Sequence, residues 1–524
     1  MSRPRVVIVG NGMAGSRVAE EVRANDPQRL VDLTVIGAET GVAYNRILLS
    51  EVLAGRHHAS DIALTVDDWH RSNEVRLRTG SPVVRIDRVN RFVETQEGDQ
   101  TEYDALVLAT GSRPWMPPLT GLFNTPQLLP ENEIGTPELI PGSFVFRTLD
   151  DCTAIEAAVA TATRAVVLGG GLLGIEAARG LAGRGLPVVL VHLADHLMER
   201  QLDATAGKML ARTLGDLGVT TRLSVSAVAV IRDGDGAFGG LTLDDGSCVL
   251  GDLLIIATGV RPEVDVARET GLEVGLGIVV DDNMRSISDR RIFAVGECAQ
   301  HNGSVYGLVA PAWDQASVVA AQITGADPQN VYRGSRIVTR LKATGVDLAS
   351  FGDPFAQGDD IDVLQVSDPG RGIYSKVLLR EERIIGAILL GQIESIATLT
   401  GLFDRNAPLP YGRLALMMPT DEGAAPAESA SPLRMPGNAI VCRCNGVTKA
   451  KIQKCILEGA RSVETVAKIT RATTGCGSCI PVVTGIIDWL SAADPVNPEI
   501  DSEIDSEIDL VAEISQLTNL ETIS

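Results

Sequence analysis

The sequence predicts an α/β protein with two nested Rossmann-like domains, a small α+β domain and a C-terminal helical domain. Three observations lead to this fold class. An apolar strand, a glycine-rich turn and a helix follow one another at residues 5–25, and the same succession returns at residues 165–183. The segment Ala-Thr-Gly-x-Arg-Pro occurs at 109–114 and again at 257–262, as expected where a chain crosses between nested domains. From about residue 335, short strands of alternating polarity replace the α/β pattern, and two of them form a predicted hairpin that turns at Glu381 and Glu382.

The first glycine turn contains Gly10, Gly12 and Gly15 after the β-branched run of residues 5–9. Such a run is typical of a buried parallel strand. In the G-x-G-x-x-G pattern the first glycine allows a tight turn, the second lets a pyrophosphate approach the backbone, and the third lets the helix pack on the strand. The pattern therefore predicts a dinucleotide site at the start of the helix. A glycine turn that serves packing alone is the alternative.

Two side chains after the second predicted strand, residues 33–36, are candidates for the same site. Glu39 lies near the position where an acid binds the adenosine ribose, and its alternative role is that of a surface carboxylate. Arg46, in the segment Tyr44-Asn45-Arg46, is placed to neutralise the pyrophosphate. No cysteine pair follows this segment, which excludes a dithiol active site like that of the disulfide reductases.

The second glycine turn contains Gly169, Gly171 and Gly174 and follows a predicted strand at residues 165–168. The next strand, residues 187–191, is followed by His192, where a ribose-binding acid is expected. Asp195 lies nearby and no arginine follows directly, which favours NADH over NADPH weakly. His192 either faces the cofactor or is an ordinary surface histidine.

Four of the eight cysteines form two closely spaced pairs, Cys442-Arg-Cys444 and Cys476-Gly-Ser-Cys479. Helices are predicted at residues 448–458, 462–469 and 480–490, the first two with Thr448 and Ser462 as N-cap candidates. Each cysteine pair therefore lies at or just before a helix start. Backbone N–H groups at such positions favour thiolates. Four sulfur ligands fit a [2Fe–2S] cluster or a tetrahedral zinc ion. The isolated cysteines are predicted to be packing residues: Cys152, Cys248, Cys298 and Cys455.

Composition and charge narrow the class of protein further. The chain has 524 residues, of which 45% are hydrophobic and 22% charged, and its net charge is −21. This acidity argues against binding to nucleic acid or to an anionic membrane. No apolar run approaches the roughly 20 residues of a membrane-spanning helix. The sparse cysteines fit a reducing cytosol. We expect a cytoplasmic protein that binds neither nucleic acid nor membranes.

The order of these parts resembles a known family. Residues 1 to about 330 resemble the FAD/NAD(P)-dependent pyridine-nucleotide oxidoreductases of the rubredoxin- and ferredoxin-reductase kind. The cysteine module resembles bacterioferritin-associated ferredoxin (BFD). Local stretches resemble the front part of the large subunit of assimilatory NAD(P)H nitrite reductase and the electron-transfer subunit of assimilatory nitrate reductase; they are residues 44–46, 171–176, 192–203, 341–348 and 442–479.

The resemblance implies where each cofactor binds, whereas no residue is assigned a catalytic role. The implied FAD ligands are Gly10, Gly12, Gly15, Glu39, Arg46, Thr110, Gly111, Gly296 and Glu297, the last of which meets the ribityl hydroxyls in flavoproteins of this kind. The implied NAD(P) ligands are Gly169, Gly171, Gly174, Glu176, His192 and Gly259. The implied ligands of the [2Fe–2S] cluster are Cys442, Cys444, Cys476 and Cys479.

The same resemblance implies a domain order. We expect an FAD-binding domain from residues 1–112 and 259–330, with an NAD(P)-binding domain at 113–258 between them. An α+β interface domain at 335–415, a linker at 421–438 and a BFD-like [2Fe–2S] domain at 439–490 follow. The acidic tail, residues 491–524, is expected to be disordered.

We therefore expect an electron-transfer oxidoreductase of nitrate or nitrite assimilation. Electrons pass from NAD(P)H through FAD and the [2Fe–2S] cluster to a separate terminal reductase. By resemblance this partner is a molybdenum nitrate reductase or, as a second choice, a sirohaem nitrite reductase. The nitrite reductase large subunit continues into sirohaem domains with four more cluster cysteines, and no second set occurs here, so nitrite reduction by this chain itself is not expected.

Two alternative functions are open at this point. A flavin-dependent amine or opine dehydrogenase subunit is one, although it would have no use for the second glycine turn at residues 169–174. A redox-sensing binding module is the other. The sequence also allows a homo-oligomer.

Overall fold

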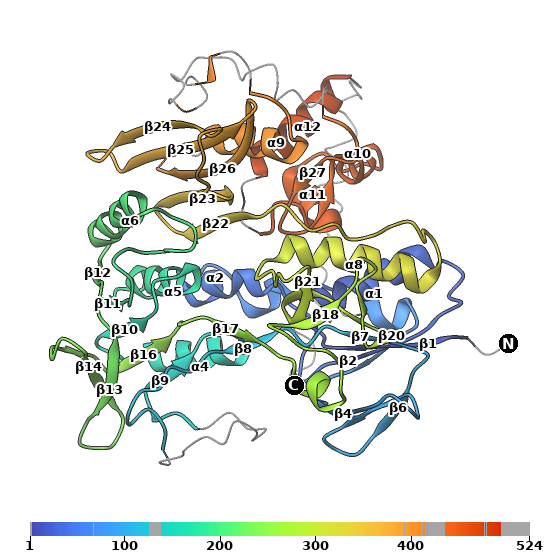
Figure 1. Cartoon of the computed structure of the whole chain (residues 1–524), viewed down its shortest axis with the longest axis horizontal. Helices are drawn as coiled ribbons and strands as arrows, with labels where there is room; N and C mark the ends of the chain where they lie inside the picture. The colour runs from blue at the N-terminus through green and yellow to red at the C-terminus, as the bar shows by residue number, and fades with distance from the viewer. Residues whose placement is uncertain are drawn as a thin grey trace, which may run out of the picture. The chain divides into compact units, whose positions relative to one another are not determined.

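A computed structural model describes residues 3–65, 68–124, 138–391, 394–409, 412–413, 417, 435–475, 477 and 479–493. The chain forms two compact units, Met1–Ala425 and Pro426–Ser524. Figure 1 labels most of their helices and strands. Most of the predicted linker and nearly all of the predicted acidic tail lie outside the described residues.

The largest sheet of the first unit has eight strands in the order β21-β18-β19-β20-β7-β1-β2-β3. At its centre β1 (Arg5–Val9) pairs in parallel with β2 (Asp32–Ile36) and β7 (Ala105–Leu108). β7 also pairs in parallel with β20 (Asp289–Ala294), which belongs to a distant part of the sequence. One sheet therefore combines two separate segments of the chain, as the nested fold class requires. Its other strands are β3 (Val75–Arg78), β18 (Ile278–Val280), β19 (Arg285–Ser286) and β21 (Ala299–His301).

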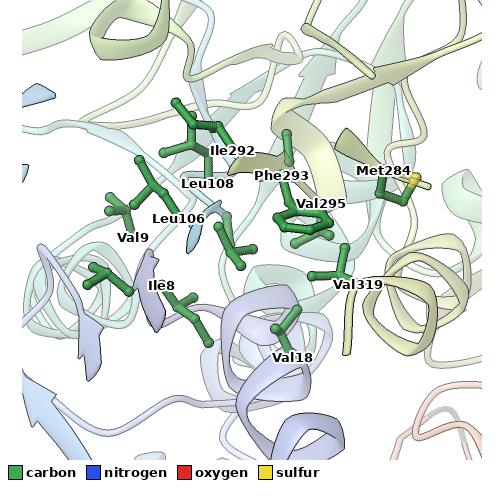
Figure 2. Close-up of a cluster of buried hydrophobic side chains, with 14 of the residues drawn as sticks. Ile8, Val9, Val18, Leu106, Leu108, Met284, Ile292, Phe293, Val295 and Val319 are labelled. Carbon is green, nitrogen blue, oxygen red and sulfur yellow. The ribbon is translucent and has the colours of Figure 1, made fainter. Parts of the chain in front are cut away.

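The central strands of this sheet carry buried apolar side chains. Ile8 on β1 and Leu106 on β7 have no exposed surface, and Phe293 on β20 has 1%. Figure 2 shows these strands' side chains meeting those of Val18 and Val319. The last two come from α1 (Met13–Asn25) and α8 (Val309–Thr324), which pack against each other. The β-branched runs recognised in the sequence thus form a buried parallel sheet.

A second parallel sheet has the order β12-β11-β10-β16-β9. β10 (Ala165–Leu168) lies between β11 (Val188–Val191) and β16 (Leu253–Ile256). Its edge strands are β12 (Val219–Arg222) and β9 (Ser143–Val145), and sequence reasoning did not anticipate β9. The helices that alternate with these strands along the chain are α4 (Leu149–Val159), α5 (Leu172–Gly183) and α6 (Ala204–Asp216).

The two crossings between these sheets lie side by side. β8 (Ser112–Pro114) and β17 (Val260–Pro262) pair antiparallel, so the two Ala-Thr-Gly-x-Arg-Pro segments meet. Two further antiparallel sheets are β4 (Val83–Asp87), β5 (Phe92–Thr95) and β6 (Gln100–Glu102), and β13 (Ala227–Arg232), β14 (Phe238–Leu243) and β15 (Cys248–Leu250). The short helices are η1 (Arg46–Leu48), α2 (Leu49–Leu53), η2 (Ala59–Ile62), α3 (Trp69–Ser72), α7 (Asp265–Glu269) and η3 (Gly296–Cys298).

The predicted α+β segment after residue 335 is a five-stranded antiparallel sheet followed by a helix. The hairpin between β25 and β26 turns at Glu381 and Glu382, as predicted, and both residues have positive φ, 49° and 59°. The sheet order is β22 (Val338–Ala343), β23 (Val346–Gly352), β26 (Arg383–Leu390), β25 (Ile373–Arg380) and β24 (Asp362–Asp368), and the helix is α9 (Glu394–Arg405).

The second unit contains the three helices predicted around the cysteines. They are α10 (Lys449–Leu457), α11 (Val463–Thr470) and α12 (Ile480–Ala493), preceded by the short strands β27 (Ile440–Cys442) and β28 (Val447–Thr448). Thr448 and Ser462 cap α10 and α11, because each hydroxyl accepts a hydrogen bond from a backbone N–H of the first turn. Both caps were expected from the sequence.

Candidate functional site

The first glycine turn is closed at two of its glycines and open at the third. Gly10 has φ +112°, and a Cβ there would lie 2.1 Å from the Ala109 carbonyl oxygen. A Cβ at Gly15 would lie 1.9 Å from the Gly10 carbonyl oxygen. At Gly12, by contrast, the nearest atom to an added Cβ is the Nε of Arg46 at 3.9 Å. The turn thus leaves space at the N-terminus of α1, where anions bind favourably.

The second glycine turn repeats this geometry. A Cβ at Gly169 would lie 2.3 Å from the Ala257 carbonyl oxygen, and one at Gly174 would lie 1.9 Å from that of Gly169. Nothing lies within 4 Å of a Cβ added at Gly171. The repeated sequence pattern is therefore a repeated structure, with one open cradle at the start of α1 and another at the start of α5.

Glu39 and Arg46 are brought together beside the first cradle. Arg46 forms an ion pair with the Glu39 carboxylate, and the Tyr44 hydroxyl donates to the same carboxylate over 2.6 Å. Burial, partly offset by the charge of Arg46, raises the pKa of Tyr44 and keeps its phenol neutral. Arg46 also donates to the Arg147 carbonyl oxygen over 3.0 Å. Glu39 is therefore held in place by two partners, unlike a typical mobile surface carboxylate.

Glu297 lies in η3, directly after β20, and is held by two residues that sequence reasoning missed. The Ser112 hydroxyl donates to its carboxylate over 2.6 Å, and Arg147 forms an ion pair with it. Gly296 has φ +77°, and its N–H donates to the side-chain oxygen of Gln315 on α8 over 2.7 Å. Arg147 carries no motif that marks it in the sequence, because its partners lie 101 and 150 residues away.

The remaining predicted residues of the crossings stabilise the turns themselves. Thr110 donates through its hydroxyl to the Glu263 carbonyl oxygen over 2.6 Å, and Glu263 N–H donates to the Gly111 carbonyl oxygen over 2.9 Å. Gly111 and Gly259 have φ values of +74° and +113°, and nothing lies within 4 Å of a Cβ added at either. Their backbone conformations explain the glycines, and the space beside them is open.

Glu176 and His192 both lie close to the second cradle. Glu176 on α5 accepts a 2.9 Å hydrogen bond from the Ser50 hydroxyl on α2. His192 is only 8% exposed, so the interpretation as a surface histidine is wrong. Its Nδ1 accepts from the Gly170 N–H over 3.1 Å, and its Nε2 lies 3.0 Å from the Glu199 carboxylate. Burial against the glycine turn explains why the side chain does not face solvent.

The cysteine module is described for three of its four predicted ligands, since Cys476 lies outside the described residues. Cys442 and Cys479 are buried and Cys444 is half-buried. Hydrogen bonding with Cys479, together with backbone N–H groups of Thr473 and Asn445, outweighs burial and lowers the pKa of Cys442 to about 6. Donors that favour the thiolate are what a cluster ligand needs. Over the described residues taken alone, no three candidate ligands gather into a metal site.

The isolated cysteines were predicted to be packing residues. Cys152, Cys298 and Cys455 are buried, as expected. Cys248 is exposed on β15, so the prediction is wrong for it; its position alternates outward on a short edge strand of a small sheet.

Comparison with known proteins accounts for this combination of sites. A family model for the pyridine nucleotide-disulphide oxidoreductases matches residues 4–316, more than half of the chain. The chain belongs to this family. Two further models match the rest of this oxidoreductase: the rubredoxin NAD+ reductase C-terminal domain at residues 338–407 and the BFD-like [2Fe–2S] binding domain at residues 440–489.

Individual relatives of this oxidoreductase carry names from nitrogen assimilation. It is 37% identical to the nitrite reductase [NAD(P)H] of Bacillus subtilis (strain 168) over 94% of its own length and 58% of the relative's. It is 33% identical to the assimilatory nitrate reductase electron transfer subunit of the same organism, over 95% and 61% of the two lengths. The chain thus spans roughly three fifths of these curated relatives.

A solved structure shows the same fold. The covalent putidaredoxin reductase–putidaredoxin complex matches this oxidoreductase with a TM-score of 0.69 and 24% identity, over 80% of this chain and 96% of the matched chain. In the part of the chain that the structure describes, no helix is long and apolar enough to cross a membrane.

The family and the BFD-like module establish the cofactors as FAD, NAD(P)H and a [2Fe–2S] cluster. The chain's own residues fit these groups. Both glycine cradles have room for a pyrophosphate at a helix N-terminus. Among the described residues, the buried side-chain oxygens of Asn11, Asn45 and Thr65 have no hydrogen-bond partner within the protein. Asn11 lies in the first glycine turn and Asn45 precedes Arg46, so a polar ligand there would satisfy them.

Proposed function

We propose that this oxidoreductase is the electron-transfer component of an assimilatory nitrate or nitrite reductase system. One observation carries the proposal: two open dinucleotide cradles and a cysteine module occur on one chain, which matches the two Bacillus subtilis relatives over 94% and 95% of its length. NAD(P)H is the electron donor, and a separate terminal reductase receives the electrons. A molybdenum nitrate reductase is the first choice, supported by the relative named as an electron transfer subunit.

The geometry of the two glycine turns supports the residues that we propose for each group. FAD would lie on the first cradle, with its pyrophosphate at Gly12 near Arg46 and its ribityl chain near Glu297. The nicotinamide dinucleotide would lie on the second cradle at Gly171, between the FAD-binding segments 1–112 and 259–330 in sequence. The other proposed ligands are Gly10, Gly15, Glu39, Thr110, Gly111 and Gly296 for FAD, Gly169, Gly174, Glu176 and Gly259 for NAD(P), and Cys442, Cys444, Cys476 and Cys479 for the cluster.

When bound, FAD takes up two electrons as a hydride and releases them one at a time, which suits transfer to an iron–sulfur cluster. The chain itself supplies binding and orientation. The backbone N–H groups at the starts of α1 and α5 would face the phosphates, and the ion pair of Arg147 with Glu297 holds that carboxylate just after the end of β20. The Ser50–Glu176 hydrogen bond joins α2 to α5, the helix that begins at the second cradle.

A reconstitution experiment tests this function. We expect the purified full chain, loaded with FAD and iron–sulfur, to reduce one-electron dyes with NADH but to leave nitrate and nitrite unchanged. Addition of a purified molybdenum nitrate reductase catalytic subunit should give NADH-dependent nitrite formation. A Cys442→Ser variant should retain NADH-dependent flavin reduction and lose this coupling.

Two results would contradict the proposal. Turnover of nitrate or nitrite by the chain alone would show that it holds its own terminal site. Coupling that survives in Cys442→Ser would show that electrons leave without the cluster. A parallel assay with a sirohaem nitrite reductase distinguishes the second candidate partner, which the similarity to the nitrite reductase of Bacillus subtilis favours.

A further inference from the structure

The end of β11 lacks the acid that recognises an adenosine ribose in dinucleotide-binding folds of this type. His192 occupies the position, and its ring faces inward rather than toward a ligand. Its Nδ1 accepts the Gly170 N–H at 3.1 Å, which leaves its Nε2 as the N–H donor in the neutral ring. That N–H points to the Glu199 carboxylate, 3.0 Å away. Two hydrogen bonds through the His192 ring therefore connect Gly170 of the glycine turn to Glu199, which lies seven residues after His192.

The backbone also fastens Glu199 to the glycine turn. Met198 donates its N–H to the Gly170 carbonyl oxygen over 3.0 Å, so Gly170 is bonded through both its N–H and its carbonyl group. Met198 adopts φ +53°, a left-handed conformation that is unfavourable for a non-glycine residue. A strained conformation persists where the surrounding contacts hold it in place, and such conformations are frequent at ligand sites.

Gly170 itself is shaped by these neighbours. A Cβ there would lie 2.7 Å from the His192 ring and 2.7 Å from Leu197. The glycine is therefore required for this loop to close on the turn, although it is not one of the three fingerprint glycines. The loop between β11 and α6 is packed onto the turn by three independent contacts.

The Glu199 carboxylate is available to a ligand. Its side chain is 41% exposed, and only Oε2 is engaged by His192 among the described residues. Oε1 is left to accept from hydroxyl groups. A carboxylate next to the glycine turn accepts hydrogen bonds from the adenosine ribose of NADH and repels the 2′-phosphate of NADPH.

We propose that Glu199 is the ribose-recognising acid of this protein, displaced from the strand end to the following loop, and that it selects NADH over NADPH. His192 is a positioning residue that holds Glu199 and does not touch the dinucleotide. The inference rests on the NAD(P) site at Gly171 proposed above. It adds which residue sets the choice of dinucleotide.

Binding measurements on the full FAD-loaded chain test the proposal without turnover. Titration calorimetry with NAD+ and with NADP+ should show NAD+ bound at least about tenfold more tightly by the parent protein. In Glu199→Gln the two affinities should converge to within about threefold, mainly because NADP+ binds more tightly. Because Glu199 is exposed, we expect the Glu199→Gln variant to fold, and retained flavin absorbance verifies that it has folded.

Asp195→Asn is the matched control. Asp195 is an acid of the same loop, is exposed, and interacts with His196 and Lys208 instead of the glycine turn. Its removal should leave the ratio of the two affinities within about twofold of the parent value. A shift of the ratio in Asp195→Asn, with none in Glu199→Gln, would overturn the proposal.

The role of His192 is tested through Glu199. His192→Phe keeps an aromatic ring and removes both hydrogen bonds, so its affinity ratio should shift in the same direction as that of Glu199→Gln. The double variant should show no further shift, because both changes act on one interaction. Additive shifts would overturn the positioning role.

Two further outcomes separate this inference from the proposed site. Tighter binding of NADP+ than NAD+ by the parent, abolished in Arg200→Gln, would assign the choice to the exposed neighbour Arg200 and overturn the role of Glu199. Binding of neither dinucleotide would overturn the NAD(P) site itself, and with it the basis of the inference.

Discussion

The Ser50 hydroxyl on α2 donates a 2.9 Å hydrogen bond to the Glu176 carboxylate on α5, although the two residues are 126 positions apart. α2 follows the segment that carries Arg46, and α5 begins at the second glycine cradle. The bond therefore links the surroundings of the two proposed dinucleotide sites. Ser50 is only 3% exposed, so water does not readily replace it.

Removal of this donor should destabilise the protein. In Ser50→Ala the buried side of the Glu176 carboxylate loses a partner, and we expect the free energy of unfolding to fall by about 1–2 kcal/mol. Chemical denaturation followed by flavin fluorescence measures the effect. Ser60→Ala, which removes an exposed hydroxyl, should change the free energy of unfolding by less than about 0.5 kcal/mol. Equal effects of the two changes would contradict the structural role of the Ser50–Glu176 bond.

The glycines of the second turn should separate folding from ligand binding. Gly171→Arg places a side chain into open space, so the protein should fold and retain FAD, while NADH no longer bleaches the flavin in anaerobic stopped-flow measurements. Gly169→Ala puts a Cβ 2.3 Å from the Ala257 carbonyl oxygen at φ +117°. We expect that change to reduce the yield of folded protein as well. Normal flavin reduction by NADH in Gly171→Arg would show that the dinucleotide lies elsewhere.

Two buried cysteines of the same small domain provide a matched test of the cluster. Cys442→Ser should abolish the broad iron–sulfur absorbance and keep the flavin bands, since a proposed ligand is lost. Cys455→Ser should keep both, because Cys455 is buried on α10 and only packs there. Absorption spectra and iron analysis of anaerobically purified protein distinguish the two. One zinc and no iron per chain in the parent would refute the [2Fe–2S] assignment.

Asp203 predicts a specific dependence of stability on pH. Burial raises the pKa of this carboxyl group, but hydrogen bonds outweigh it and leave the pKa below its ordinary value. The donors are the Tyr374 hydroxyl at 2.6 Å, the Ala206 N–H at 3.0 Å and Lys376 at 3.2 Å. Because the pKa is lower in the folded state, the contribution of the charged form is complete above the unfolded-state pKa and is lost as the pH falls through the folded-state pKa.

Asp203→Asn should therefore remove this part of the acid sensitivity. Asparagine still caps α6, so the change acts mainly on the charge. Below about pH 4, the unfolding temperature of the parent should fall more steeply with decreasing pH than that of the variant. Asp235→Asn, at an exposed position, should follow the parent curve. Parallel curves for the parent and Asp203→Asn would contradict the prediction.

Much of the fold and part of the site could be predicted from the sequence. The β-branched runs, the two glycine patterns, the caps Thr448 and Ser462, and the hairpin at Glu381 and Glu382 all follow from local periodicity and turn chemistry. The cysteine spacing likewise marked the module that the BFD-like family model matches.

The tertiary structure alone decided which distant side chains meet. Arg147 partners Glu297 across 150 positions of the chain, and Ser50 partners Glu176 across 126 positions. It also buried His192, which excludes the alternative of a surface histidine, and it exposed Cys248, against the sequence-based expectation. The physical reason is the same in each case: strand and helix propensities are set by neighbours in the chain, whereas hydrogen-bond partners and burial depend on packing between elements that the sequence separates by many residues.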